Sequence, residues 1–308
     1  MLTVNDYPRV AILMATFNGM AWIEAQLDSI LTQENVNVTL YVSDDGSVDG
    51  TYEYLQAITQ IDPRVVLLPR VAKSGSAGQN FYRLIRDVTT DHFDYVAYAD
   101  QDDIWCQGKL IRQINLLNQQ QAAAVSSNVM AYWPNGTERL IVKSQEQRKW
   151  DYIFESAGPG CSFLMTPWLV ACVREQLLDI RSQARYVSLH DWLTYAVCRA
   201  LGAKWVIDAN PTLHYRQHAS NVVGANIGTL AKWTRIIQLQ RGWYRNEVNK
   251  ISEVCAMISK DPKHKFISRL TGSKSILYNL KLLSFVSGAR RSFIDRLVLA
   301  VCLVLFIF

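Results

Sequence analysis

Short, continuous apolar runs alternate with helically spaced apolar residues over the first 120 residues, and this alternation limits the fold more than any other feature. The runs "RVAILMATF", "NVTLYVSDDGS", "RVVLLP" and "FDYVAYADQDD" have the pattern of strands, with a helix-like segment after each. Continuous apolar strands are typical of parallel sheets, which are covered on both faces. The pattern predicts an α/β fold with a mostly parallel central sheet and helices on both faces.

Three of these strands end in polar or acidic residues, at positions 16–18, 44–47 and 100–103. Because the carboxyl ends of parallel strands meet at one edge of a sheet, we expect these segments on one rim. The chain has no G-x-G-x-x-G after its first strand and no G-x-x-x-x-G-K-[ST] segment, which disfavours the usual dinucleotide and P-loop sites. A nucleotide here would need another means of holding its phosphates, such as a metal ion on carboxylates.

The charge of the chain changes sign along its length. Residues 231–308 hold 14 Lys and Arg against 4 Asp and Glu. Residues 1–230 hold the other 18 of the chain's 32 Lys and Arg and the other 23 of its 27 Asp and Glu. We therefore expect an α/β domain over residues 1–230 and a basic, helical carboxyl-terminal extension over residues 231–308. A basic extension favours an anionic partner, either nucleic acid or the cytoplasmic leaflet of a membrane. No nucleic-acid motif accompanies it, so no nucleic-acid partner is expected.

The last 12 residues, 297–308, are all apolar and follow three arginines at 290, 291 and 296. About 20 apolar residues are needed to span a bilayer as a helix, so this segment is predicted to lie in the membrane interface. A core helix or a dimer-forming helix is the alternative. The polar first ten residues do not have the pattern of a secretory leader, and the six scattered cysteines fit free thiols in the cytoplasm.

Five motifs then occur in a specific order: "ATFNG", "SDDGSVDGT", "ADQDDIW", "GPGCSF" and "HDW". With these spacings the chain resembles, over about residues 10–224, the family 2 glycosyltransferases, which are inverting, nucleotide-sugar-dependent enzymes with the GT-A fold. The segment "YRQHASNVVG" is similar to the subgroup of bacterial rhamnosyltransferase-like enzymes that assemble surface polysaccharides. The resemblance implies a GT-A catalytic domain over residues 1–230.

The carboxylates of "ADQDDIW" would repel one another unless a cation or full hydration relieves them, and a solvated acidic turn is the plain alternative. The resemblance implies a divalent cation, Mn²⁺ or Mg²⁺, that bridges the donor's phosphates. We assign the metal chiefly to Asp102, with Asp100 on a metal-bound water or the ribose. Asp103 is expected to orient the turn or to face the acceptor.

For the nucleotide, the resemblance places Ala15, Thr16 and Phe17 under a pyrimidine base, with Asn18 beside them, and Asp45 on the ring N–H. An aromatic ring offers a stacking face, and a carboxylate accepts from the imide N–H of uracil or thymine. A plain turn is the alternative for "SDDGS". We also predict that Asn80, which follows the loop "KSGSAGQ", contacts the donor.

An inverting transfer needs one carboxylate to take the proton of the attacking hydroxyl. The resemblance assigns this base to Asp191 of "HDW", at the start of a helix, where a low pKa is expected unless burial opposes it. A simple helix cap is the alternative. Trp192 is predicted to stack on the acceptor sugar, and Arg216 to contact the diphosphate. His218 could contact the diphosphate, make a second metal contact or anchor a loop.

Together these features predict a membrane-associated cytoplasmic glycosyltransferase on the inner membrane. It would move L-rhamnose from dTDP-L-rhamnose onto a lipid-linked glycan in O-antigen or related polysaccharide synthesis. One alternative is a UDP-hexose or UDP-furanose donor on the same fold. Another is a non-enzymatic membrane-docking module of a polysaccharide assembly complex. The oligomeric state stays open.

Overall fold

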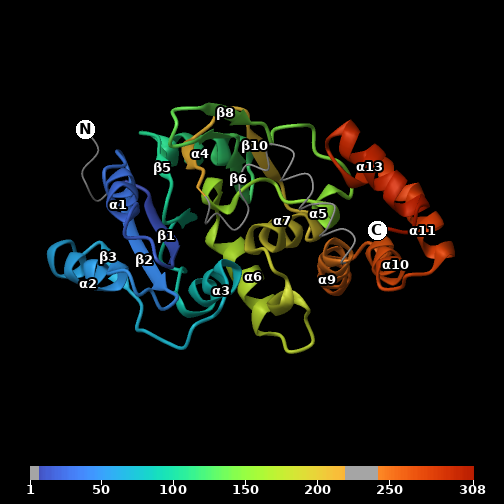
Figure 1. Ribbon diagram of the computed structural model, residues 1–308, viewed down its shortest axis with the longest axis horizontal. Helices are drawn as coiled ribbons and strands as arrows, with labels where there is room; N and C mark the ends of the chain where they lie inside the picture. Colours follow the sequence, from blue (N-terminus) through green and yellow to red (C-terminus); the bar gives the residue numbers. More distant parts are fainter. Residues whose placement is uncertain (1–6, 219–241) are drawn as a thin grey trace.

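A computed structural model describes residues 7–218 and 242–308, and it confirms the α/β architecture (Figure 1). Seven strands form the central sheet, all parallel to their neighbours except β9, which runs antiparallel to both strands beside it. The predicted boundary at residue 230 lies outside the described residues. In spatial order the strands are β10 (Trp205–Asp208), β6 (Ala124–Ser127), β9 (Leu164–Met165), β4 (Tyr95–Asp100), β1 (Arg9–Thr16), β2 (Asn37–Asp44) and β3 (Val65–Leu67).

Helices cover both faces of this sheet, as the continuous apolar strands predict. Along β1, Ile12 packs into one core and Leu13 into the other, because successive side chains of a strand point to opposite faces. The Ile12 core is closed by α1 (Ile23–Leu31), α2 (Thr51–Ile61) and α4 (Lys109–Gln120). The Leu13 core is closed by α3 (Ala77–Asp87), α6 (Pro167–Leu178) and α7 (His190–Ala200).

The apolar segment over residues 122–133 forms two strands that belong to two different sheets. After β6 the chain passes Asn128, whose side chain bonds Ala209 O and the backbone N–H of Lys143, and then leaves the central sheet. This switch builds a second sheet beside the rim, in the order β5 (Ile104–Trp105), β11 (Leu213–Arg216), β7 (Val129–Tyr132) and β8 (Glu138–Ile141). The pairing of β11 with β5 brings Arg216 next to the acidic turn.

The carboxyl-terminal extension is helical, as predicted, and lies against the α7 side of the molecule (Figure 1). Val248, Ile251 and Leu303 belong to the same continuous core as the residues of α7, so the extension shares the core of the α/β part. Its helices are α9 (Trp243–Ile258), α10 (Pro262–Thr271), α11 (Ile276–Leu282), α12 (Val286–Ala289) and α13 (Phe293–Val304), and the short helix α5 (Asp151–Phe154) lies between α12 and α7.

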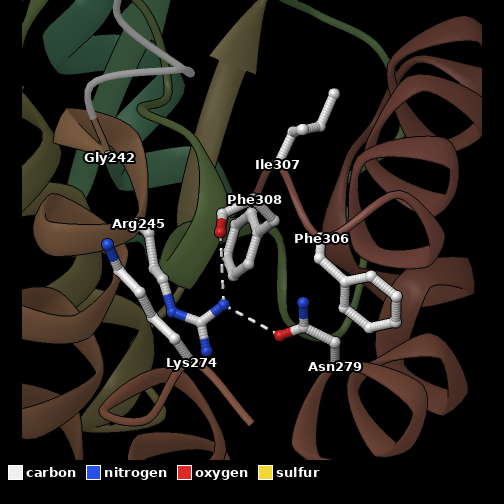
Figure 2. A pocket seen from close by; sticks show the side chains of 7 residues that line it. All are labelled: Gly242, Arg245, Lys274, Asn279, Phe306, Ile307 and Phe308. Atoms are coloured by element: carbon white, nitrogen blue, oxygen red, sulfur yellow. Dashed lines mark hydrogen bonds between the residues drawn. The ribbon is translucent and has the colours of Figure 1, made fainter. Parts of the chain in front are cut away.

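The apolar carboxyl-terminal end is half buried, so it is partly a core helix and partly a surface. In α13, Leu299 and Leu303 are buried, and so is Phe308 beyond the helix, whereas most of their neighbours are exposed. Figure 2 shows Phe308 beside a cavity of about 80 Å³, where the buried Arg245 guanidinium donates to Asn279 Oδ1 at 2.8 Å and Phe308 O at 3.3 Å. Within the described residues, no helix combines the length and apolarity required to cross a membrane.

Candidate functional site

The sheet register brings the predicted polar strand ends together. Thr16 at the end of β1 lies opposite Asp44 of β2, and Ala15 lies opposite Asp100 of β4. Three parallel strands thus end at one level, and the turns that follow them form the rim expected from the sequence.

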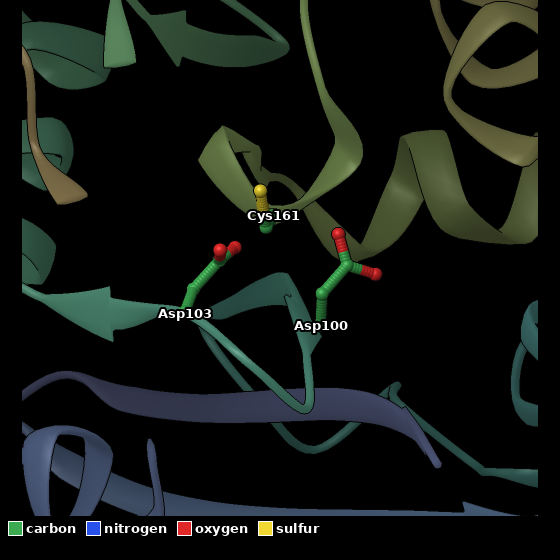
Figure 3. A group of neighbouring side chains, drawn as sticks. All are labelled: Asp100, Asp103 and Cys161. Atoms are coloured by element: carbon green, nitrogen blue, oxygen red, sulfur yellow. The ribbon is translucent and has the colours of Figure 1, made fainter. Parts of the chain in front are cut away.

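Asp103 does not face an acceptor. Its side chain is fully buried, and its Oδ1 accepts from the backbone N–H of Arg216 at 3.2 Å. Figure 3 shows the Asp103 and Asp100 carboxylates on either side of the Cys161 thiol. Asp103 therefore orients the acidic turn against β11, which corrects the predicted acceptor contact and leaves the turn-orienting role.

Burial and mutual repulsion favour the protonated forms of these carboxyl groups. Burial, aided by the Asp102 charge, raises the pKa of Asp100 to about 7, and the same causes raise the pKa of Asp103 well above its usual range. Burial likewise raises the pKa of the Cys161 thiol, so Cys161 acts as a weak donor to the carboxylates rather than as a thiolate. A bound cation would favour the ionised carboxylates.

The donor set fits a hard divalent cation. Ligand atoms of Asp100, Asp103 and Cys161 lie within 4.8 Å of one another, but Asp103 and Cys161 are fully buried and the thiol is protonated. Asp100 is partly exposed, and Asp102 of the same turn retains 9% exposure. Carboxylate oxygens are preferred ligands of Mg²⁺ and Mn²⁺, so Asp102 and Asp100 are the residues suited to hold it.

Two residues after β10 reach this turn from far along the chain. His218 Nε2 lies 2.6 Å from Asp102 Oδ2, and the ring stacks on Trp22 with centroids 4.1 Å apart. Arg216 Nε donates to Asp102 O at 2.8 Å, while its guanidinium lies 4.9 Å from the centre of the Tyr132 ring. The structure therefore brings both predicted phosphate contacts to the acidic turn. The rest of the "YRQHASNVVG" segment, from residue 219, lies outside the described residues.

The predicted base pocket has one exposed aromatic face. Phe17 is 48% exposed. Its backbone N–H donates to Gln101 Oε1 at 2.8 Å, and its backbone carbonyl accepts from Gln101 Nε2 at 2.9 Å. Lys73 Nζ lies 5.3 Å from the Phe17 ring centre. Asp45, on the next strand end, accepts from Gly75 N at 3.0 Å and from Ser74 N. The loop at 73–75 thus borders the pocket.

The residues that flank Phe17 shape the rim from behind. Ala15 and Thr16 are buried, so only their backbones could lie under a base. Asn18 takes a left-handed conformation, with φ of 49°, and its Oδ1 accepts from Val48 N at 2.9 Å. Asparagine tolerates that conformation better than most residues. The hydrogen bond from Val48 N to Asn18 connects the turn after β1 to the turn after β2.

Asn80 does not contact a donor, contrary to the prediction. It is buried, and its side chain bonds Ser43 Oγ, Ser43 O at 2.8 Å and Thr16 O at 3.3 Å. Buried amides are kept where they satisfy backbone groups, and here the amide fastens α3 to the ends of β1 and β2.

Trp192 does not offer its ring to an acceptor either. It is buried, donates its indole N–H to Tyr152 O at 2.9 Å and stacks near Tyr244 of α9. One residue further along a helix turns the side chain by about 100°, so Trp192 faces the core while Asp191 faces the rim.

Asp191 lies half-buried in the first turn of α7. Burial raises its pKa to about 6, although the Trp192 N–H, the Lys143 charge and the Ser156 hydroxyl oppose that shift. Burial therefore outweighs the helix amino terminus. Gly160 of "GPGCSF" lies against the neighbouring His190, and an added Cβ would lie 2.4 Å from His190 Nε2, so only glycine fits there.

Four residues of this arrangement were missed from the sequence. Lys73, Gln101, Lys143 and Ser156 are each near a predicted site residue. Lys73 and Gln101 lie inside segments already singled out by their motifs, so position alone could have suggested them. Lys143 and Ser156 follow β8 and α5, and no local pattern marks them.

Comparison with known proteins gives consistent matches. Residues 11–166 match Glycosyl transferase family 2. The chain is 39% identical over 296 residues to the dTDP-rhamnosyl transferase RfbG of Shigella flexneri, covering 96% of this chain and 100% of that protein. It is 28% identical over 160 residues to the UDP-Glc:alpha-D-GlcNAc-diphosphoundecaprenol beta-1,3-glucosyltransferase WfgD of Escherichia coli, covering 51% of this chain and 59% of that protein. In fold it is similar to the mannosyltransferase PcManGT of Pyrobaculum calidifontis, with a TM-score of 0.52 and 18% identity, covering 98% of this chain and 81% of that one.

Proposed function

Because the chain belongs to glycosyl transferase family 2, we propose that it transfers L-rhamnose from dTDP-L-rhamnose to a lipid-linked glycan. The main support is the 39% identity, over the full length, to a protein named as a dTDP-rhamnosyl transferase. The fold and the rim of carboxylates suit a nucleotide-sugar donor. The pathway would be that of O-antigen or another surface polysaccharide.

The reaction in this proposal is a single in-line displacement. The acceptor hydroxyl attacks the anomeric carbon of rhamnose, the bond to the diphosphate breaks, and the hydroxyl proton passes to the Asp191 carboxylate. A base with a pKa of about 6 is ionised at neutral pH and still basic enough to assist proton removal. Its place in the first turn of α7, near enough to Asp100 to raise that group's pKa, suits an attack beside the phosphates.

The remaining rim residues bind and orient the donor in this proposal. Phe17 stacks on thymine and Asp45 accepts from its ring N–H, while Arg216 and His218 contact the diphosphate. Asp102 and Asp100 would hold Mn²⁺ or Mg²⁺, which would supply Lewis-acid stabilisation for the charge on the leaving diphosphate.

A lipid-linked acceptor is in keeping with the name of the Escherichia coli relative, which specifies a diphosphoundecaprenol-linked substrate. The extension also has an exposed apolar surface, which we call the α11/α13 face. Basic side chains at Lys274 and Lys281 are exposed in the same region. We propose that this face docks on the anionic cytoplasmic leaflet. Its exposed apolar residues are Ile276, Leu277, Leu280, Phe293, Ile294, Leu297, Val298 and Val301.

A donor panel tests the proposal. The full chain is incubated with dTDP-L-rhamnose, UDP-galactose, UDP-N-acetylglucosamine or a UDP-furanose, each with Mn²⁺ or Mg²⁺, and released nucleoside diphosphate is measured. We expect the fastest release from dTDP-L-rhamnose and none under chelation. Faster release from a UDP-sugar would favour the UDP-donor alternative. No release from any donor, with or without metal, would favour the non-enzymatic docking module.

A further inference from the structure

The segment between α12 and α13 of the extension enters the α/β part of the molecule beside the loop that follows α5. Arg291, which is buried, donates its backbone N–H to Glu155 Oε1 at 2.6 Å and its Nη2 to Ser156 O at 2.5 Å. Arg290 donates to Phe154 O at 3.0 Å. The last residue of α5 and the two residues that follow it are thus held by two successive residues of the extension.

Ser156 connects this contact to Asp191. Its hydroxyl donates to Gly158 O at 2.9 Å, and it lies near enough to the Asp191 carboxylate to lower the pKa of that group. The turn that follows leads to Gly160, which packs against His190 and whose added Cβ would lie 3.4 Å from Asp191 Cβ. Residues 156–160 therefore lie against Asp191, and their position constrains the position of its side chain.

A second connection runs through Asp151 of α5. Tyr195, one turn after Asp191 in α7, donates its hydroxyl to both Asp151 oxygens at 3.0 Å. Arg199 Nη1 lies 3.3 Å from Asp151 Oδ1, and Arg291 Nη1 lies 3.9 Å from Asp151 Oδ2. The helix that starts with the proposed base is thus tied to the same arginine of the extension.

Stability alone is a weak explanation for this arginine. Within the described part of the chain, Arg291 Nε and Nη1 are buried and make no hydrogen bond. A buried ion pair often contributes no more stability than a well-packed apolar replacement, and an unsatisfied buried donor is a cost that calls for a reason. A requirement for fixed geometry at residues 155–156 supplies one.

We propose that the carboxyl-terminal extension completes the active site, with Arg291 as a positioning residue that fixes the loop over residues 155–160 against Asp191. This inference rests on the proposed role of Asp191 as the base. The sequence predicted a membrane-associating end for the extension, and the proposal adds a role inside the site. Through Arg291, the α11/α13 face and the proposed base belong to one packed unit.

The charged and titratable groups around Asp191 determine the sign of the expected pH effect. The Lys143 charge, from the segment after β8, lowers the pKa of Asp191. Burial raises the pKa values of Asp100 and Tyr98 in β4 and of Tyr82 in α3, and the Asp191 charge adds to each of these shifts. The adjacent His190, whose pKa burial lowers to about 3, stays neutral. Because the Ser156 hydroxyl lowers the pKa of Asp191, its displacement raises that pKa, and the acidic limb of the rate profile moves to higher pH.

The test uses the full chain with Arg291→Met, Ser156→Ala and a matched control, Arg174→Met. Arg174 also donates to two backbone carbonyls, Ile85 O and Val88 O, away from residues 155–163. The first measurement is hydrogen exchange of the peptide over residues 155–163. The second is kcat, KM and the pH profile of dTDP release from dTDP-L-rhamnose.

We expect faster hydrogen exchange over residues 155–163 in Arg291→Met, but not in Ser156→Ala or Arg174→Met. In Arg291→Met and Ser156→Ala we expect kcat to fall about 10- to 100-fold, with donor KM unchanged and the acidic limb moved to higher pH. Unchanged exchange in folded Arg291→Met overturns the proposal whatever the donor. If Arg291→Met does not fold, Ser156→Ala decides by its pH profile, and an unmoved limb overturns it. Full activity of Asp191→Asn would instead refute the base, and exchange would still decide whether Arg291 fixes the loop.

Discussion

Membrane docking by the α11/α13 face can be tested by replacing three side chains at the start of α13. Phe293, Ile294 and Leu297 are 71%, 69% and 57% exposed, so Ser at all three positions disturbs the core little. Full burial of such a side chain contributes about 1.5–3 kcal/mol, and the exposed fractions correspond to roughly 1–2 kcal/mol each. If all three enter the interface, the triple variant loses about 3–6 kcal/mol of membrane affinity, a factor of roughly 10²–10⁴ in partition.

The assay is co-sedimentation with vesicles that contain or lack anionic lipid, at low and high salt. A control variant replaces three apolar residues outside the extension that are at least as exposed, Val48, Ile61 and Ile180, with Ser. We expect wild type and control to sediment with anionic vesicles in a salt-sensitive way, and the triple variant to stay in solution. Equal sedimentation of the triple variant, or equal binding of wild type to neutral vesicles, would refute the docking face.

Deleting residues 297–308 would be a poor substitute for that experiment. The deletion removes Leu299, Leu303 and Phe308, which are buried, at a cost of about 5–9 kcal/mol. A protein of this kind has a total free energy of unfolding of about 5–15 kcal/mol. We therefore expect the deletion to unfold or aggregate, so that its loss from the membrane would say nothing about docking.

The remaining predictions concern the rim. Asp102→Asn should abolish both transfer and the response to Mn²⁺, and full activity under strong chelation would contradict the metal assignment. Asp191→Asn should keep dTDP affinity, measured by calorimetry, and lose about 10²–10⁴-fold in rate; lost affinity with intact turnover would make it a binding residue. In wild type the rate should fall below about pH 6, because burial raises the pKa of Asp191 to about 6 and the base is protonated there. Asn80→Ala should lower the free energy of unfolding by about 1–3 kcal/mol, with dTDP affinity nearly unchanged; normal stability with lost affinity would restore its donor role.

The central sheet and its rim could be predicted because local patterns determine them. The apolar run of β1 is one continuous stretch of sequence, and so is each group of polar residues that follows β1, β2 or β4. The parallel arrangement places the carboxyl ends of these three strands together. The contact between His218 and Asp102 joins residues 116 positions apart. No period or spacing indicates such a contact, and only the motif resemblance suggested that both residues belong to one site.

Trp192 and Asn80 show two different reasons for a wrong prediction. Every residue of α7 except Asp191 and Arg199 is buried, and a helix that is apolar on all sides is typical of a core position. The apolar sequence of α7 could therefore have predicted an inward Trp192. Asn80 had no such signal, because a polar residue early in a helix can satisfy either a ligand or the ends of neighbouring strands.

The extension shows what a count of charges leaves out. Its basic excess suggested an anionic partner, yet three of its arginines serve internal contacts: Arg245 on backbone carbonyls and Asn279, Arg290 on Phe154 O and Arg291 on Glu155 and Ser156. Arg290 and Arg291 are paired with the carboxylates of Glu155, Asp295 and Asp151, and these negative charges offset their contribution to the field at the surface. The salt dependence of membrane binding must therefore come mainly from exposed lysines such as Lys274 and Lys281. Replacing those two lysines should weaken binding to anionic vesicles, whereas replacing Arg291 should alter the geometry at Asp191.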